Sequence, residues 1–234
     1  MKWTKKEEDL LITLRGANVP YRDKIKHFEG KTQDALRNKM NQLRNREKVE
    51  TLDDELIGVF DIETSDLKAD VGYMLGWAVY YPHEDRVVSD IITKKEVTNL
   101  TLDKRVCKSL LKEFQNIDIL MGYYSTKFDI PFFRTRCLMN GLKNFPGYGT
   151  MRHIDCFYFA RGKVATRRKA MGVIAEALGL QEKTHEPLPV WNKARLGDAK
   201  SLAKLRSYNE NDVIVCWQIY KELLKYGKYT AKSI

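Results

Sequence analysis

The sequence predicts an α/β fold in which a mixed sheet is flanked by helices, with a small three-helix domain in front of it. Three observations lead to this prediction. Residues 55–93 contain three apolar runs of strand length, which suit a meander. Strand-like and helix-like runs then alternate as far as residue 226, which is typical of an α/β sheet. Before residue 50, apolar residues recur at helical spacing instead.

The composition indicates a globular protein with an anionic partner. The 234 residues are 43% hydrophobic and 31% charged, which is enough for one sizeable domain and a small one. The formal net charge of +10 favours nucleic acid or an anionic surface as the partner. No apolar run approaches the length of a membrane span, so no membrane contact is expected. The 4 cysteines are scattered without metal or disulfide spacing, and a reducing cytoplasm is therefore the expected location.

Residues 1–49 are predicted to form three short helices. Thr4 and Glu7 make a capping box at the first helix, and Leu36, Met40 and Leu43 lie at helical spacing in the third. The remaining faces of the third helix are basic and amide-rich, with Arg37, Lys39, Asn41 and Arg44 among their residues. Such a last helix suits the helix-turn-helix plan, in which it enters the DNA major groove.

The segments WTKKEEDLL and FEGKTQDALRNKMNQL resemble a Myb/SANT-type repeat over residues 3–45, with Trp3 as the first core tryptophan. The later tryptophans of that family are missing, and Phe28 and Met40 stand in their place. The resemblance implies that residues 1–49 bind DNA. A helical bundle that binds protein is the alternative, because a fold alone does not fix function. The acidic run 50–55 is expected to be a linker.

The segment FDIETSD, residues 60–66, places acids at the end of an apolar strand. Side chains alternate along a strand, so Ile57, Val59, Asp61 and Glu63 share one face. Two core residues are thus followed by two adjacent acids. Like charges this close repel unless a proton or a cation lies between them. The pattern therefore predicts a cation site at the end of this strand.

Two further acids lie in apolar surroundings. Asp129 lies within the aromatic run FDIPFF, and Asp212 lies in the apolar stripe of a long helix, one turn after Tyr208. A buried carboxylate is costly unless it is paired or bound to a metal. Helix capping or an ion pair could account for any one of these acids. Four acids, each at a strand end or in a core stripe, favour a common site.

The motifs Asp61-Ile-Glu63, Phe128-Asp129 and Tyr208-x-x-x-Asp212, in this order, resemble the DEDD superfamily of 3′–5′ exonucleases. The last motif is that of the tyrosine subgroup. The resemblance covers about residues 55–226 and is closest to ribonuclease-H-like exonucleases and to the proofreading domains of family B polymerases. It implies a ribonuclease-H-like exonuclease domain over residues 55–230. Many relatives have an asparagine shortly before the second motif, where this chain has Tyr124.

The resemblance also implies the chemistry of the site. Two Mg²⁺ or Mn²⁺ ions are expected, since such ions prefer oxygen ligands and can together activate water and stabilise a phosphoryl group. Asp61, Glu63 and Asp212 would hold the first ion, and Asp61 would bridge to the second, with Asp129 supporting it through water. Tyr208 would orient the attacking water. Its ordinary pKa of about 10 suits it poorly to act as a base at neutral pH.

Substrate contacts are predicted from charge and from position. Arg167 and Arg168 lie in the basic segment ARGKVATRRKA, which either follows a phosphate backbone or is a solvated loop. Ile62, Thr64 and Phe128 flank the acids and either contact the terminal base or belong to the core. Asp155 is a further acid expected near this face.

The sequence therefore predicts an enzyme that shortens DNA from its 3′ end and is tethered to the duplex by its N-terminal helices. RNA is the close alternative substrate, because no residue is identified that reads a 2′ hydroxyl. A catalytically silent nuclease fold that binds DNA or serves as a scaffold, and an endonuclease that cuts junctions, are further alternatives. A role in replication editing would need a polymerase or another replication or repair protein as a separate partner.

Overall fold

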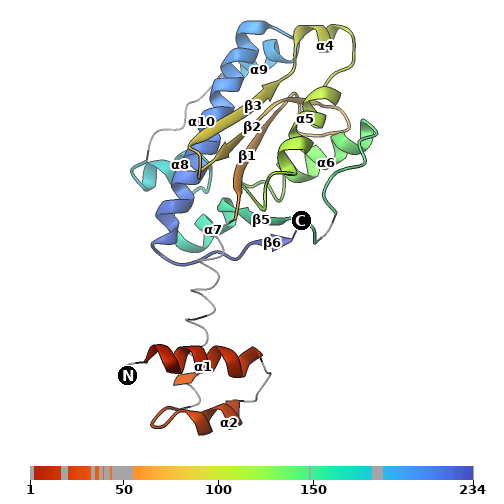
Figure 1. Cartoon of the computed structure of the whole chain (residues 1–234). Helices are drawn as coiled ribbons and strands as arrows, with labels where there is room; N and C mark the ends of the chain where they lie inside the picture. Colours follow the sequence, from red (N-terminus) through yellow and green to blue (C-terminus); the bar gives the residue numbers. More distant parts are fainter. Residues whose placement is uncertain are drawn as a thin grey trace. The chain divides into compact units, whose positions relative to one another are not determined.

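The computed structural model divides the chain into two compact units, Met1–Glu55 and Leu56–Ile234 (Figure 1). The structure describes residues 3–16, 21–32, 35–36, 39, 43, 55–147, 149–180 and 187–233. All of the expected linker except Glu55 lies outside these ranges. Within them, no helix combines the length and the apolar character that a membrane span requires.

The N-terminal unit begins with a capped helix. Its described elements are helix α1 (Lys5–Gly16), helix α2 (Tyr21–Lys24) and the 3₁₀ helix η1 (Ile25–His27). The predicted capping box is confirmed: the Thr4 backbone N–H donates to Glu7 Oε2 at 2.8 Å, and the Glu7 N–H donates to Thr4 Oγ1 at 3.3 Å. These bonds satisfy donors that the first helical turn leaves without partners.

The core of this unit is small and apolar. Four buried side chains form it, namely Leu11, Phe28, Leu36 and Leu43. Trp3 packs against them, with its ring centre 5.8 Å from that of Phe28. Leu36 and Leu43 are helical and face inward, as the third helical pattern predicts. Met40 and most other residues of that predicted helix lie outside the described ranges.

Lys39, which is predicted among the nucleic-acid contacts of the third helix, does not lie on an exposed face. Its side chain is buried, and its Nζ lies 2.5 Å from Glu8 Oε1 on α1. The same ammonium lies 5.9 Å from the centre of the Trp3 ring. A long side chain can cover an apolar ring with its methylene groups while its charge meets a carboxylate. Lys39 therefore stabilises the N-terminal unit from within.

The second unit is built on a six-stranded sheet in the order β3-β2-β1-β4-β5-β6. The strands are β1 (Ile57–Thr64), β2 (Met74–Tyr81), β3 (Arg86–Ile91), β4 (Ile119–Gly122), β5 (Arg152–Asp155) and β6 (Lys232–Ser233). β1, β2 and β3 form an antiparallel meander, whereas β1, β4 and β5 run parallel. β6 pairs antiparallel with β5 at the edge. The predicted mixed sheet is confirmed, and its short strand β5 leads directly into a helix.

Helices cover both faces of this sheet (Figure 1). They are α4 (Lys94–Thr98), α5 (Lys104–Phe114), α6 (Asp129–Met139), α7 (Cys156–Lys163), α8 (Met171–Ala177), α9 (Leu188–Ala194) and α10 (Ala199–Leu224). Phe60 of β1 meets Phe114 of α5 in an edge-to-face contact at 5.4 Å. Its neighbour Asp61 accepts a hydrogen bond from Asn209 of α10. Successive strand residues point to opposite faces, so α5 and α10 lie on opposite sides of β1.

Small residues allow α10 to pack closely over the middle of the sheet. Asp61 pairs with Ala78 of β2, and Glu63 pairs with Gly76. Directly paired residues of antiparallel strands share a face, so these two small residues lie on the α10 side with the acids. The pairing shifts by one position between Glu63 and Thr64, which is a bulge at the end of β1. Such bulges re-aim side chains at the ends of strands.

A buried ion pair joins α5, α6 and β2 on the other side of the sheet. Asp103, fully buried, accepts hydrogen bonds from Arg136 Nε at 2.8 Å and from Arg136 Nη2 at 2.9 Å. The Met74 backbone N–H and the Asn140 amide also donate to it. Burial by itself would raise the pKa of Asp103, but these bonds outweigh burial and lower the pKa below its ordinary value.

Candidate active site

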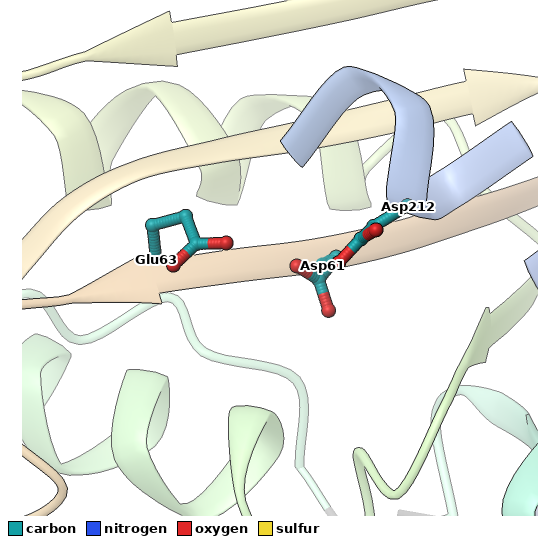
Figure 2. Close-up of side chains that lie close together, drawn as sticks. All are labelled: Asp61, Glu63 and Asp212. Carbon is teal, nitrogen blue, oxygen red and sulfur yellow. The ribbon is translucent and has the colours of Figure 1, made fainter. Parts of the chain in front are cut away.

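Three of the predicted acids meet on the α10 face of the sheet. Asp61 and Glu63 extend from β1, and Asp212 approaches them from α10 (Figure 2). One carboxylate oxygen from each lies within 4.8 Å of the others. Asp212 and Glu63 are buried, and Asp61 is partly exposed. Three oxygen ligands at this separation form a suitable cage for a hard divalent cation.

Asp129 lies at the same cleft from another direction. It opens α6, is buried, and accepts a hydrogen bond from the Ile62 backbone N–H at 3.2 Å. The cleft has a volume of about 210 Å³ and is lined by all four acids and by Tyr208. Residues up to 151 positions apart in the sequence thus converge on one hollow. The structure places the five predicted catalytic residues together, and their roles stay predictions.

Neutral donors orient two of the carboxylates. The Asn209 amide donates to Asp61 Oδ2 at 2.6 Å, and the Trp191 indole N–H donates to Glu63 Oε2 at 3.2 Å. The Trp191 ring also meets Tyr208 edge-to-face at 5.5 Å. These two donors are neutral, so they fix the direction of a carboxylate without adding positive charge beside it.

Neither of these donors was predicted from the sequence. Asn209 could have been found, because it lies three residues before Asp212 and therefore on the same side of the helix. Trp191 is in α9, and it contacts Glu63 across 128 positions of sequence. No periodic pattern in the sequence marks that contact.

The residues present fit a divalent cation. The ligand atoms are carboxylate oxygens, which Mg²⁺ and Mn²⁺ prefer. Within the described part of the chain, the Asn209 Oδ1 atom is buried without a hydrogen-bond partner, beside the carboxylate that its amide nitrogen contacts. Buried acceptors are costly unless water or an ion satisfies them. A water molecule bound to a cation can donate a hydrogen bond to this oxygen.

Asp155 is near the cleft, as expected, but its contacts are structural. It is buried at the end of β5 and accepts hydrogen bonds from the backbone N–H groups of Tyr124 at 2.9 Å and Thr126 at 3.0 Å. It also caps α7 by accepting from the Phe157 N–H at 3.0 Å. Three backbone donors surround this carboxylate, which therefore fixes the turn after β4.

That turn is held on its other side by a buried pair. Ser125 Oγ lies 2.9 Å from His153 Nε2, and both side chains are buried. A Cβ added at Gly122 would lie 2.5 Å from Ser125 Oγ, so only glycine allows the turn to fold back this closely. Burial lowers the pKa of His153 to about 4, although Asp155 acts in the opposite direction. His153 is therefore neutral at physiological pH.

The residues predicted to contact the substrate differ in burial. Ile62 and Thr64 are buried, and Ile62 belongs to the main apolar core. Phe128 is partly buried, lines the cleft, and lies 5.7 Å from Phe132. Arg167 and Arg168 are exposed between α7 and α8. Arg37, Asn41 and Arg44 lie outside the described residues, so their predicted contacts stay predictions.

Comparison with known proteins assigns the family. A family model described as RNase_H superfamily matches residues 59–224, which contain every acid of the cleft. The chain belongs to the RNase H superfamily. The expected ribonuclease-H-like fold is thereby confirmed, with β1 carrying acids on one face and α10 lying above them. The matched range ends at the last residue of α10.

A solved structure has a similar fold. The family B DNA polymerase of the hyperthermophilic archaeon Pyrobaculum calidifontis superimposes with a TM-score of 0.57 at 18% sequence identity. The alignment covers 74% of this chain and 25% of the polymerase, so the chain spans a quarter of that protein's length. At this identity the likeness concerns the fold. None of the curated proteins matches the chain.

Proposed function

We propose that this RNase H superfamily member is a metal-dependent 3′–5′ exonuclease that removes nucleotides from DNA. One observation carries the proposal: Asp61, Glu63 and Asp212 bring carboxylate oxygens within 4.8 Å of one another. Asp129 and Tyr208 line the same cleft. This is the complete set of residues that the DEDD resemblance requires, and the tyrosine subgroup follows from Tyr208.

The acids would hold two Mg²⁺ or Mn²⁺ ions. Asp61, Glu63 and Asp212 would hold one ion, and Asp61 would also reach the other, with Asp129 supporting it through water. When bound, such ions lower the pKa of water and neutralise charge on the phosphoryl oxygens. Asn209 and Trp191 fix the directions of Asp61 and Glu63 through their hydrogen bonds. Preorganised ligands do not have to be ordered when the substrate arrives.

Tyr208 positions the attacking water in this proposal. Its ring is held by the edge-to-face contact with Trp191, and it lies one turn before Asp212 on α10. The phenol can accept a hydrogen bond from water, or donate one, without changing its own charge. Because Trp191 contacts both Glu63 and Tyr208, a single side chain aligns a metal ligand with the group that orients the water.

The N-terminal unit, proposed as a Myb/SANT-like domain over residues 1–49, would tether the enzyme to duplex DNA. Its capped first helix and small apolar core suit a helix-turn-helix domain. Removal of residues 1–50 should weaken duplex binding and reduce its dependence on salt, with little change in the rate on short single strands. Equal duplex affinity with and without these residues would contradict the tether.

Hydrolysis products distinguish this function from its alternatives. The chain is incubated with Mg²⁺ and 5′-labelled single-stranded DNA, double-stranded DNA or RNA, with Asp61→Asn as the inactive variant. Asp66→Asn is the matched control, because Asp66 is exposed and accepts from the Lys68 N–H outside the cleft. A ladder of shortened DNA with the native chain and with the control supports the proposal. A faster ladder on RNA would assign RNA as the substrate.

Two other outcomes would contradict the proposal. Discrete internal cuts would indicate an endonuclease, and a shifted band without shortening would indicate a silent nuclease fold that binds DNA.

A further inference from the structure

A second hollow lies between α9 and the first turns of α10, which are side by side (Figure 1). It has a volume of about 550 Å³, which is within the range of cavities that bind ligands. We call it the lysine hollow, and its lining includes Pro189, Val190 and Lys193 of α9 and Lys200, Ser201 and Lys204 of α10. None of its described lining residues is among those of the acid cleft, so the two sites are separate.

The rim of the lysine hollow is positively charged. Lys193, Lys200 and Lys204 are all exposed. Among the described lining residues one is an acid, Asp198, which caps α10 by accepting from the Ser201 backbone N–H at 2.9 Å. Hydrogen bonds from Ser201 lower the pKa of Asp198, so this acid is ionised at neutral pH. Three ammonium groups still outnumber one carboxylate, and the lining therefore attracts an anionic ligand.

The floor of the lysine hollow is apolar. Val190 is buried in the main core, and Pro189 precedes it in the first turn of α9. Two leucines flank these residues in the sequence: Leu188, which begins α9, is 72% exposed, and Leu196, after the end of α9, is 74% exposed. Exposed apolar side chains among charged groups are typical of surfaces that contact another protein. The hollow thus offers an apolar contact beside its positive charges.

The turn between α9 and α10 holds this surface in one conformation. The Leu196 N–H donates to the Lys193 carbonyl at 3.0 Å. The Gly197 N–H donates to the Ala194 carbonyl at 2.8 Å. Gly197 has a φ of 82°, and a Cβ at this position would lie 3.0 Å from Lys94 Cα, so glycine lets the turn pack closely on α4. A surface that is already ordered loses less conformational entropy when it binds a partner.

We propose that the lysine hollow binds an acidic segment of a partner protein, whose carboxylates meet the three lysines and whose apolar side chain packs on Val190. The positive rim and the apolar floor match the two properties of such a segment. Nucleic acid fits less well, because none of the described lining residues is aromatic and unpaired bases usually stack on aromatic rings. The proposal does not depend on the exonuclease, since the two sites share none of their described lining residues.

Selection from a library of short random peptides displayed on phage identifies ligands of the full chain. The library is first depleted on the double variant Lys193→Glu with Lys204→Glu, so that peptides which need the native lysines remain. The enriched peptides should carry several aspartates or glutamates and at least one large apolar residue. Enrichment of basic or uncharged peptides, or no enrichment, would overturn the inference.

Fluorescence anisotropy then measures the affinity of the most enriched peptide. Lys193→Glu with Lys204→Glu should weaken binding by about tenfold or more, because two attractive charges become repulsive. Lys193→Gln with Lys204→Gln should weaken it less, since no repulsive charge is added. A urea unfolding midpoint close to the native one shows that each variant is folded.

The matched control is Lys108→Glu with Lys112→Glu. Both lysines are exposed on α5, on the other side of the sheet from α10, and the control changes the net charge by the same amount. Its affinity for the peptide should stay within about twofold of the native value. An equal loss in both glutamate variants would show unspecific attraction to a basic protein and would overturn the inference.

Nucleic acid as the occupant is tested with the same two glutamate variants. Their affinities for fluorescein-labelled single-stranded and duplex DNA are measured in EDTA, and an equal change in both variants is expected because their net charges are equal. A clearly larger loss of DNA binding in the variant of the hollow would assign the hollow to nucleic acid and overturn the inference. Peptide binding that depends on the lysines, without hydrolysis in Mg²⁺, would support the inference and contradict the exonuclease.

Discussion

The second unit buries carboxylates in two regions on opposite faces of one sheet, and it treats them differently. Asp103 meets the Arg136 guanidinium through two hydrogen bonds, of 2.8 and 2.9 Å, and its pKa is lowered. In the acid cleft, oxygens of Asp61, Glu63 and Asp212 approach one another within 4.8 Å. The donors seen on Asp61 and Glu63 there are an amide and an indole.

The difference separates a carboxylate that stabilises the fold from carboxylates kept for a ligand. A bidentate arginine neutralises Asp103 inside the protein, so the folded chain is complete without any added ion. An amide and an indole orient Asp61 and Glu63, and neither donor adds a positive charge beside these acids, whose negative charges repel one another. Substitutions in the two regions should therefore have opposite effects on activity and stability.

The largest expected effect is on hydrolysis. Asp61→Asn should lower the rate by about 10³-fold or more, since the several kcal/mol that a bound metal supplies to the reaction are lost. The same change should leave the free energy of unfolding in EDTA equal or raised, because it removes one of three mutually repelling charges. Steady-state assays and urea unfolding measure the two quantities. A clear loss of stability in EDTA would show instead that Asp61, like Asp103, is an acid that stabilises the fold.

The reverse is expected at Asp103. Asp103→Ala should destabilise the fold by about 3–5 kcal/mol, because the Arg136 charge stays buried without its partner. Urea unfolding measures this loss, and the rate per folded molecule should stay close to native. The double variant Asp103→Leu with Arg136→Met should recover much of the loss, since it removes both buried charges. A double variant less stable than Asp103→Ala would contradict this account of the ion pair.

His153 differs from the buried carboxylates because it is neutral in the folded chain at physiological pH. Its pKa is lowered to about 4 in the folded chain, whereas an unfolded histidine titrates near 6.5. Between these two pH values the unfolded chain binds more protons, so the free energy of unfolding falls as the pH drops from 6.5 to 4. The loss reaches about 3 kcal/mol at most.

The variant His153→Gln isolates this contribution. It should flatten the dependence of unfolding free energy on pH between 4 and 6.5, as measured by urea unfolding at several pH values. The remaining slope would then come from the carboxylates. The same slope in the variant and in the native chain would show that His153 is not the group responsible.

The smallest expected effect is at Trp191. Trp191→Phe keeps a ring against Tyr208 but removes the N–H that holds Glu63, and should lower kcat by about tenfold, as expected for one hydrogen bond to a charged group. It should also raise the Mn²⁺ concentration needed for half-maximal rate. Trp217→Phe is the matched control, because Trp217 stacks on Tyr220 in the last third of α10. Equal metal dependence in both variants would contradict a positioning role for Trp191.

Local patterns in the sequence were sufficient to predict much of the site. The alternation along β1 places Asp61 and Glu63 on one face, and the stripe along α10 aims Asp212 inward. Each of these predictions depends on the geometry of a single element. The acids meet because α10 packs on β1. This packing is a feature of the fold class, which the order of strands and helices predicts.

Other features depend on contacts that no local pattern shows. Trp191 meets Glu63 from a helix of 7 residues, and the left-handed φ of Tyr124 depends on Asp155, which is 31 positions later. Lys39 was predicted to contact nucleic acid because it belongs to the basic, amide-rich faces of the third helical pattern. Its burial follows from Glu8 and Trp3 of the same unit. Tertiary partners decided each of these cases.

The most direct test of the central claim is anomalous diffraction from crystals of the native chain soaked in MnCl₂. The account predicts a peak about 2.0–2.3 Å from oxygens of Asp61, Glu63 and Asp212, and no such peak in crystals of Asp61→Asn soaked in the same way. Manganese bound elsewhere while these three carboxylates bind none would contradict the claim that the cleft is a metal centre.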